Sequence, residues 1–441
     1  MPEHPLADGL TAALPRQNPD PDPDPAAARA AMVARLEDED ALHPGPVRDV
    51  LLELAREVLM QQAYVRRTAD DVTPPEWTLL DWARPADRAE LLDILHCGES
   101  VLTQHDDEPI LGREAGTWRK GGEITSLSSG MTMTAGLMEQ LGLQPGMRVL
   151  NLGTGPGVTC AITSIICGAQ YVVSLDSSAH VTEATRVHLA RLGLHPTLVT
   201  GQGEDGWPDL APYDRIFASY AVPAIPAAWL EQLAPNGLAL AHLTSGSPSW
   251  PALAVITKTT LGTIAGELRP ARYGHRAGHG LPRLYLTKPF RDRIDAREGA
   301  AVTRSRQEAP ASTERGFWVA YDALHPGAVR RGGVEHLVIG APACGSWMIA
   351  EPATNGAWTV RSCGPRNIWA EIQDTATRWR AAGSPDSYQL HLDTDGTQWV
   401  STRTGAGSGL LSWPLPVAVP PAPRQSTAPD TKERSDQEMT A

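Results

Sequence analysis

A glycine-rich turn followed at a distance by an acid is the part of this sequence best suited to hold a ligand. The apolar run 148–152 ends in Gly153-Thr154-Gly155-Pro156-Gly157, and a second apolar run, 171–175, ends in Asp176. Strand, glycine turn, helix-length segment and a second strand closing on an acid form the first half of a Rossmann-like nucleotide fold. The pattern predicts an adenosine-containing ligand with its ribose at Asp176.

The residues around the turn distinguish between adenosine ligands. In a G-x-G-x-x-G fingerprint the pyrophosphate approaches a helix N-terminus, but Val158 stands where the third glycine belongs and Pro156 removes a backbone donor. NAD and FAD are therefore disfavoured. S-adenosylmethionine has no phosphate and needs only a turn with little side-chain bulk and an acid for the ribose diol. It is the favoured cofactor, although a tight strand-to-helix turn without a ligand fits the same spacing.

Several ordered blocks accompany the turn. They are Thr125-Ser126-Leu127-Ser128-Ser129-Gly130-Met131, Leu141-Gly142-Leu143-Gln144-Pro145-Gly146, Gly201-Gln202-Gly203, Gly206-Trp207, Ala211-Pro212-Tyr213-Asp214-Arg215-Ile216 and Val222-Pro223-Ala224-Ile225-Pro226. Over about residues 96 to 245 they resemble the protein-L-isoaspartate O-methyltransferase family, whose T-I-S-Q-P, G-D-G, G-W, A-P-Y-D-x-I and x-P-x-I-P segments follow the same order. The resemblance implies an α/β fold, the Rossmann-like class I S-adenosylmethionine-dependent methyltransferase, with an N-terminal helical subdomain.

The resemblance also implies which residues form the site. The cofactor-binding positions are Gly153, Thr154, Gly155, Gly157, Asp176, Ser177, Gln202 and Gly203. Ser129 matches the serine of the family's substrate site. Two departures stand out: Gly130-Met131 replaces Gln-Pro, and Gln202 replaces an Asp that contacts the adenine amine. The Gln carbonyl can still accept a hydrogen bond from that amine.

The implied substrate is an aspartyl or isoaspartyl carboxylate in a protein or peptide. The chain looks closest to a long subgroup of the family with an extra C-terminal region. Some of its members methylate an Asp side chain of a ribosomally made peptide, which then closes to an aspartimide. Repair of isoaspartyl proteins is the commoner activity. A non-catalytic peptide-binding module on a degenerate fold and a small-molecule O-methyltransferase remain as alternatives.

Methyl transfer to a carboxylate requires no general base, because the acceptor is already ionised, so positioning does most of the work. Hydroxyls suffice for that task, and Ser129, Ser128 and Thr125 supply them on one turn. The same serines are also typical of a helix N-cap before Met131.

Other polar residues give weaker signals. His105 and Asp106 lie upstream and could line the same cleft, but a loop histidine is usually only solvated. The pair His275 and His279 lies among glycines, without a cysteine or carboxylate to complete a ligand set, so no metal is expected.

Composition favours a cytoplasmic enzyme. The 441 residues allow two or three domains with cores, and no stretch approaches the roughly 20 apolar residues that span a bilayer. Five scattered cysteines fit a reducing compartment. A formal net charge of -13 argues against a nucleic-acid partner. The oligomeric state is left open.

Four parts are expected along the chain. Residues 1–45, with Pro-Asp alternation up to residue 25, are predicted to be a disordered tail. Residues 46–260 are the methyltransferase domain, with a helical subdomain from about 47 to 105 and alternating strands and helices after it. Residues 261–417, with seven of the thirteen tryptophans, are predicted to be a C-terminal α+β domain, and residues 418–441 a second disordered tail.

Two elements of that C-terminal domain are specific. Apolar spacing predicts a helix from Ile368 to beyond Trp379, and Asp395-Gly396 predicts a β-hairpin. The tryptophans are more often core than binding platform, because their spacing on the helix repeats with the apolar stripe.

Overall fold

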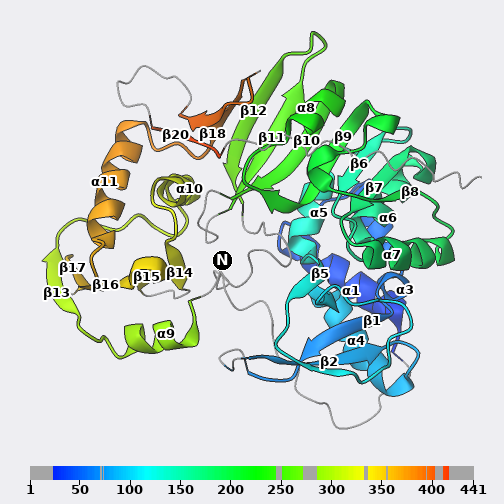
Figure 1. Ribbon diagram of the computed structural model, residues 1–441, viewed down its shortest axis with the longest axis horizontal. Coiled ribbons are helices and arrows are strands. Elements are labelled where there is room, and N and C mark those ends of the chain that lie inside the picture. Colours follow the sequence, from blue (N-terminus) through cyan, green and yellow to red (C-terminus); the bar gives the residue numbers. More distant parts are fainter. Residues whose placement is uncertain are drawn as a thin grey trace, which may run out of the picture.

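The computed structural model describes residues 23–416 except 70–71, 73, 245–250, 272–285, 332–335, 354–355, 394 and 403–410. Within them the chain forms three sheets and the helices that cover them (Figure 1). The second expected tail, 418–441, and the pair His275 and His279 lie outside the described residues.

The central sheet contains ten described strands and carries the glycine turn. In sheet order they are β20 (Ser412–Pro414), β19 (Gln398–Ser401), β18 (Tyr388–Leu392), β12 (Ile264–Pro270), β11 (Ala252–Lys258), β10 (Leu233–Leu243), β9 (Tyr213–Val222), β6 (Val149–Leu152), β7 (Val172–Asp176) and β8 (Thr197–Thr200). The five strands from β10 to β8 are parallel. The chain runs outward from β6 through β7 to β8 and then returns to β9, so the strand order reverses between β6 and β9. In open α/β sheets, ligands bind at the carboxyl ends of the strands beside that switch point.

The Rossmann-like prediction for this region is confirmed. Helices α6 (Val158–Cys167), α7 (Ala179–Arg191) and α8 (Ala227–Gln232) alternate with its strands, as expected for this region. Every residue of β6 is buried, as expected for a parallel strand covered on both faces. The Ser178 side chain caps α7 by accepting from the amide of Val181. Helix α5 (Met131–Gln140) precedes β6.

The N-terminal part is mixed, so the prediction of a helical subdomain is wrong. Its antiparallel sheet has the order β4 (Trp118–Lys120), β2 (Glu76–Asp81), β1 (Gln62–Arg66), β3 (Val101–His105), β5 (Ile124–Ser128). The helical spacing seen in the sequence belongs to α2 (Pro46–Glu53), α3 (Arg56–Leu59) and α4 (Pro85–His96). The strands are short, and β1 buries three consecutive residues, which hides the period of two that marks a strand.

The expected N-terminal tail is corrected from residue 23 onward, whereas residues 1–22 lie outside the described residues. Residues 25–38 form helix α1 (Pro25–Asp38), which buries Met32, Val33 and Leu36. The Pro-Asp alternation ends in a helix start, because Asp24 accepts from the amide of Ala26 and Pro25 fits the first helical position.

The predicted boundary at residue 260 does not separate two units. Strands β11 and β12 form a hairpin across it, and β12 pairs with β18, so the C-terminal strands continue the central sheet. One hydrophobic core includes Leu150 beside the glycine turn and Trp413 near the end of the described chain. The tryptophan-rich composition after residue 260 therefore does not mark the start of a separately packed domain.

The other C-terminal elements form a separate antiparallel sheet. Its order is β13 (Ala301–Ser305), β17 (Trp358–Cys363), β16 (Ser346–Pro352), β15 (Leu337–Ala341), β14 (Val329–Arg331), with helices α9 (Lys288–Asp295), α10 (Arg315–Leu324) and α11 (Ile368–Ala381). The predicted helix is α11, which buries Trp369 and Trp379, and the predicted hairpin is β18–β19. These parts of the prediction are confirmed. Among the described helices none is long and apolar enough to cross a membrane.

Buried histidines predict that the fold is sensitive to acid. Burial lowers the pKa of His96 to about 3 and that of His188 to about 4. Between pH 6.5, where these side chains titrate in the unfolded chain, and pH 4, the unfolded state binds more protons, so stability falls as pH falls. Melting temperatures across this range should decline, and His96→Gln should flatten the decline. The same change at the exposed His195 should leave it unaltered.

Candidate functional site

The glycine turn after β6 requires glycines for steric reasons. Gly153, Gly155 and Gly157 have φ angles of 84°, 50° and 91°. A Cβ at Gly153 would collide with the Ser219 hydroxyl, and one at Gly157 would lie 2.7 Å from Cγ2 of Thr185. Side chains larger than hydrogen therefore do not fit, and the turn presents bare backbone at the carboxyl end of β6.

Asp176 ends β7 and is tied to this turn. Its Oδ2 accepts from the Gly155 amide at 2.9 Å, and its Oδ1 accepts from the Ser178 amide at 3.0 Å. Burial raises the pKa of Asp176, and the hydrogen bonds from the amides of Gly155 and Ser178 oppose the shift. Each carboxylate oxygen accepts one of these bonds, and each has a second lone pair suited to a hydroxyl donor.

The turn at Gln202 and Gly203 lies at the same edge. The preceding Gly201 donates its amide to the Asp176 carbonyl at 2.9 Å. A Cβ at Gly203 would collide with the hydroxyl of Tyr220, whose ring also borders Gly153. Gln202 itself is exposed. The predicted cofactor residues of three separate loops are therefore brought together.

Two predicted cofactor residues differ in how their side chains are placed. Thr154 is 2% exposed, and its hydroxyl pairs with that of Ser174 at 2.7 Å. The Ser177 side chain is exposed. Each borders the site through its backbone, and Ser177 adds an amide that lowers the pKa of Asp176.

Strand β5 of the N-terminal sheet packs against the glycine turn. The carbonyl of Leu127 lies 3.3 Å and the hydroxyl of Ser126 lies 3.9 Å from the position of a Cβ on Gly155. Ser126 is buried and accepts from the Thr103 hydroxyl at 3.1 Å. This contact brings the Ser126 hydroxyl of β5 to the glycine turn. The sequence analysis did not predict Ser126 as a site residue.

The three hydroxyls predicted for the acceptor side have different environments. Thr125 donates to Oε1 of Gln104 at 3.0 Å. Ser128 is buried and accepts from the guanidinium of Arg56 at 3.4 Å, so it helps to anchor the turn. Ser129 is partly exposed just before α5. Gly130, not a serine, is the N-cap residue of α5, and no side chain caps that helix, so the N-cap reading of the serines is wrong.

The loop after β3 also reaches the site. Asp106 and Asp107 have φ angles of 50° and 49°, a strained conformation that surrounding bonds must hold. Asp107 accepts from the Ser178 hydroxyl at 2.5 Å, which attaches this loop to the residue that also binds Asp176. His105 is completely buried, and its ring centroid lies 4.6 Å from that of Tyr64. The expectation of a solvated histidine is therefore wrong.

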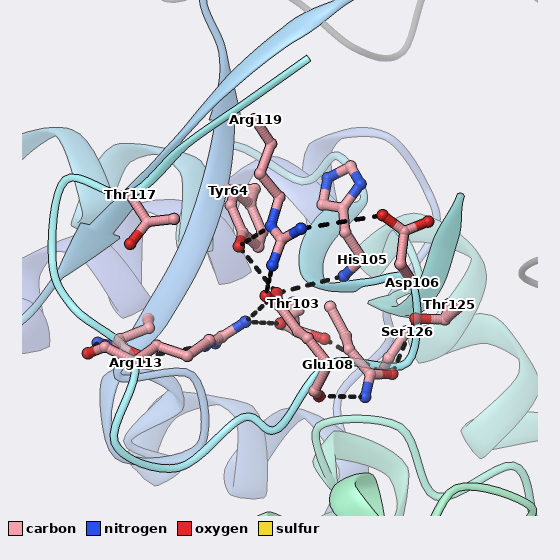
Figure 2. Close-up of polar contacts among 12 residues, drawn as sticks. Tyr64, Thr103, His105, Asp106, Glu108, Arg113, Thr117, Arg119, Thr125 and Ser126 are labelled. Carbon is pink, nitrogen blue, oxygen red and sulfur yellow. Dashed lines mark hydrogen bonds and ion pairs between the residues drawn. The ribbon is translucent and has the colours of Figure 1, made fainter. Parts of the chain in front are cut away.

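Glu108 anchors the loop, as Figure 2 shows. Its carboxylate accepts from Tyr64 at 2.8 Å, from Arg113 at 3.0 Å and from Arg119. Burial raises the pKa of Glu108, but the hydrogen bonds from Tyr64 and Arg113 and the charges of both arginines outweigh it, so the pKa lies below its ordinary value. Glu108 is therefore ionised at neutral pH and fixes the loop by charge-assisted bonds.

Comparison with known proteins identifies the family of this region. A model of the family protein-L-isoaspartate(D-aspartate) O-methyltransferase matches residues 121–259. A protein-L-isoaspartate O-methyltransferase of Paramagnetospirillum magneticum is 33% identical over 159 residues, which cover 34% of this chain and 73% of that protein. The chain belongs to the protein-L-isoaspartate O-methyltransferase family.

Other relatives are matched over shorter stretches. A protein-L-isoaspartate O-methyltransferase of Thermotoga maritima is 38% identical over 118 residues, which cover 26% of this chain and 37% of that protein. The chain thus spans less than half the length of several relatives that it matches. A solved structure of a protein-L-isoaspartate O-methyltransferase covers 85% of this chain with 19% identity and a TM-score of 0.46.

The family's matched region ends before the C-terminal third of this chain. Residues 121–259 include the glycine turn, Asp176, Gln202 and the serine turn. The loop at Asp107 and its anchor Glu108 lie upstream of the match. Asp107 was missed because its neighbour Ser178 is distant in sequence, and no local pattern signals that contact.

Removing the carboxylate of Glu108 should destabilise the protein. In Glu108→Gln the guanidinium of Arg113, whose side chain is 8% exposed, loses its carboxylate partner. We expect a loss of about 3 kcal/mol in unfolding free energy, measured by urea denaturation. Glu76→Gln, which breaks the exposed pair with Lys120, should cost less than about 1 kcal/mol. Equal losses in the two variants would show that Glu108 is not an anchor.

Proposed function

We propose that this chain is an S-adenosylmethionine-dependent carboxyl O-methyltransferase that acts on an aspartyl or isoaspartyl carboxylate of a protein or peptide. The observation that carries the proposal is the glycine cradle tied to Asp176 at the switch point of the sheet, with strand β5 against Gly155. Family membership supports the reaction class.

The residues of this edge fit the cofactor. Asp176 would accept hydrogen bonds from the two ribose hydroxyls, the glycine turn would present its bare backbone to the nucleoside, and Gln202, exposed at the same edge, would face the adenine. When bound, S-adenosylmethionine would supply an electrophilic methyl group: the bond from carboxylate oxygen to methyl carbon would form as the carbon–sulfur bond breaks, giving a methyl ester and S-adenosylhomocysteine.

The protein's contribution to the reaction is positional. The acceptor carboxylate is ionised near pH 7, so no side chain has to remove a proton. Ser129 and Thr125, with the missed Ser126, are the hydroxyls that would orient the acceptor and exclude water beside the glycine turn. No metal enters this scheme.

We further propose that the acceptor belongs to a particular peptide, with closure to an aspartimide after methylation. The support is the C-terminal region, which lies beyond the family match and shares a core with the cofactor half. General isoaspartyl repair is the competing candidate, since it is the activity after which the family is named. Selectivity for one peptide needs contacts beyond the reacting carboxylate, and this region is available to provide them.

Asp176→Ala should weaken binding of S-adenosylmethionine by about 1.5–3 kcal/mol, the cost of losing hydrogen bonds to a charged group. Calorimetry measures this directly, and Asp209→Ala, at an exposed position, is the control. Unchanged affinity in Asp176→Ala would rule out Asp176 as the ribose ligand.

The affinity for S-adenosylmethionine should also depend on pH through the carboxylate of Asp176. The hydroxyl donors of the ribose require the ionised carboxylate, and burial raises the pKa of Asp176 above 3.8. Cofactor affinity should therefore fall as pH drops toward that raised pKa, and this decline should be absent in Asp176→Asn. An identical acid profile in both proteins would assign the titration to another group.

The product bond gives a second test. A carboxyl methyl ester hydrolyses in mild base, so transferred radiolabelled methyl should be released as volatile methanol at alkaline pH. A base-stable label would contradict carboxyl methylation and favour a small-molecule or N-methyl reaction. Cofactor binding with no transfer to any aspartyl or isoaspartyl peptide would favour the non-catalytic binding module.

Mass spectrometry separates the two acceptor classes. Methylation of an ordinary Asp followed by ring closure leaves a peptide one water lighter than the substrate. If unmodified Asp peptides remain untouched while generic isoaspartyl peptides are methylated, repair is the activity.

A further inference from the structure

The C-terminal hairpin β18–β19 makes a direct polar contact with the loop that leaves the cofactor edge. Gln398, at the start of β19, is 5% exposed. Its Oε1 accepts from the amide of Ile225 at 2.9 Å, and its Nε2 donates to the carbonyl of Ile225 at 2.6 Å. One side chain thus satisfies both backbone groups of a residue 173 positions away.

Ile225 has few other ways to satisfy its backbone. It is completely buried between β9 and α8, and Pro223 and Pro226 beside it have no amide hydrogens. Buried backbone groups in a loop need partners, and a carboxamide supplies a donor and an acceptor in the arrangement of a β-bridge. The pairing of β18 with β19 and the bond from the Leu415 amide to the Gln398 carbonyl hold Gln398 in place.

The segment that contains Ile225 borders the cofactor turns at both of its ends. At its start, the Ser219 hydroxyl donates to the carbonyl of Gly153 at 2.7 Å. At its end, Nε1 of Trp229 donates to the carbonyl of Gly203 at 2.8 Å. The segment 219–229 is therefore fixed to both glycine turns, and Gln398 holds its middle.

We propose that Gln398 is a positioning residue for methyl transfer, through which the C-terminal hairpin sets the place of segment 219–229 beside the reacting groups. The kinetic consequences of this inference rest on the proposed function. The contact between Gln398 and Ile225 is independent of it. It makes the C-terminal region part of the catalytic body and explains why the central sheet continues through β18 and β19.

The test compares three variants of the full-length protein. Gln398→Leu removes both bonds to Ile225, whereas Gln398→Glu keeps the acceptor for the Ile225 amide and loses the donor. The matched control is Gln373→Leu on α11, because Gln373 is 7% exposed and donates to the carbonyl of Glu308, away from segment 219–229. We measure kcat and KM for an aspartyl or isoaspartyl peptide, and the Kd for S-adenosylhomocysteine by calorimetry.

In Gln398→Leu we expect kcat to fall about tenfold and the Kd for S-adenosylhomocysteine to change by less than kcat does, because Asp176 keeps its own amide bonds while the turns at Gly153 and Gly203 are held through the segment. In Gln398→Glu, kcat should recover as pH falls, because the protonated carboxyl regains a donor for the Ile225 carbonyl. Wild type and Gln373→Leu should show no such recovery. Wild-type kcat in Gln398→Leu, or no pH-dependent recovery in Gln398→Glu, would overturn the proposal.

Amide hydrogen exchange at Val222, Ala224 and Ile225 separates this inference from the proposed function. Exchange there should be faster in Gln398→Leu than in wild type and Gln373→Leu, with or without turnover. If the wild type transfers no methyl group, the proposed function fails, and faster exchange still supports the clamp on Ile225. If Gln398→Leu does not fold, the same two measurements are made on Gln398→Glu: its amide exchange and the pH dependence of its kcat. Exchange equal to that of the wild type would then overturn the clamp.

Discussion

The hydrogen bond from the Gly155 amide to the Asp176 carboxylate joins the ends of two parallel strands, and most of the site depends on it. A buried carboxylate needs donors, and these come from the turn after β6 and from the first residues after β7. To deliver its amide, the turn adopts positive φ angles that only glycines tolerate without strain. The anion, the bare backbone and the strand order reversal then coincide at one edge, where an adenosine group can be held by its ribose.

Structures from both ends of the chain converge on that edge. From the N-terminal sheet come β5, which packs on Gly155, and the strained loop at Asp107, which reaches Ser178 and is anchored by Glu108. From the C-terminal region comes the hairpin whose Gln398 holds Ile225. Each contact fixes the position of a loop at or beside this edge, which suits a reaction in which orientation, and not acid or base chemistry, lowers the barrier.

The sequence predicted those parts of the fold that local periodicity and turn chemistry determine. Strands β6 and β7 are largely apolar runs bounded by the glycine turn and Asp176, and α11 and the β18–β19 hairpin follow clear local patterns, so these were found. The N-terminal strands were missed because they are short, and their burial depends on a sheet assembled from residues up to 128. The C-terminal boundary was misplaced because the pairing of β12 with β18 joins segments more than a hundred residues apart. In the site, the glycines and Asp176 can be predicted from residue type and spacing. Ser126, Asp107 and Gln398 make contacts with residues distant in sequence, and no local pattern indicates those contacts.

The most direct test of the central claim is a crystal structure of the full chain with S-adenosyl-L-homocysteine. We expect both ribose hydroxyls within hydrogen-bonding distance of the Asp176 carboxylate, the nucleoside over the backbone of Gly155, and the sulfur directed toward the serine turn that follows β5. A ligand whose ribose lies away from Asp176, or a crystal grown with saturating ligand in which this edge binds none, would contradict it.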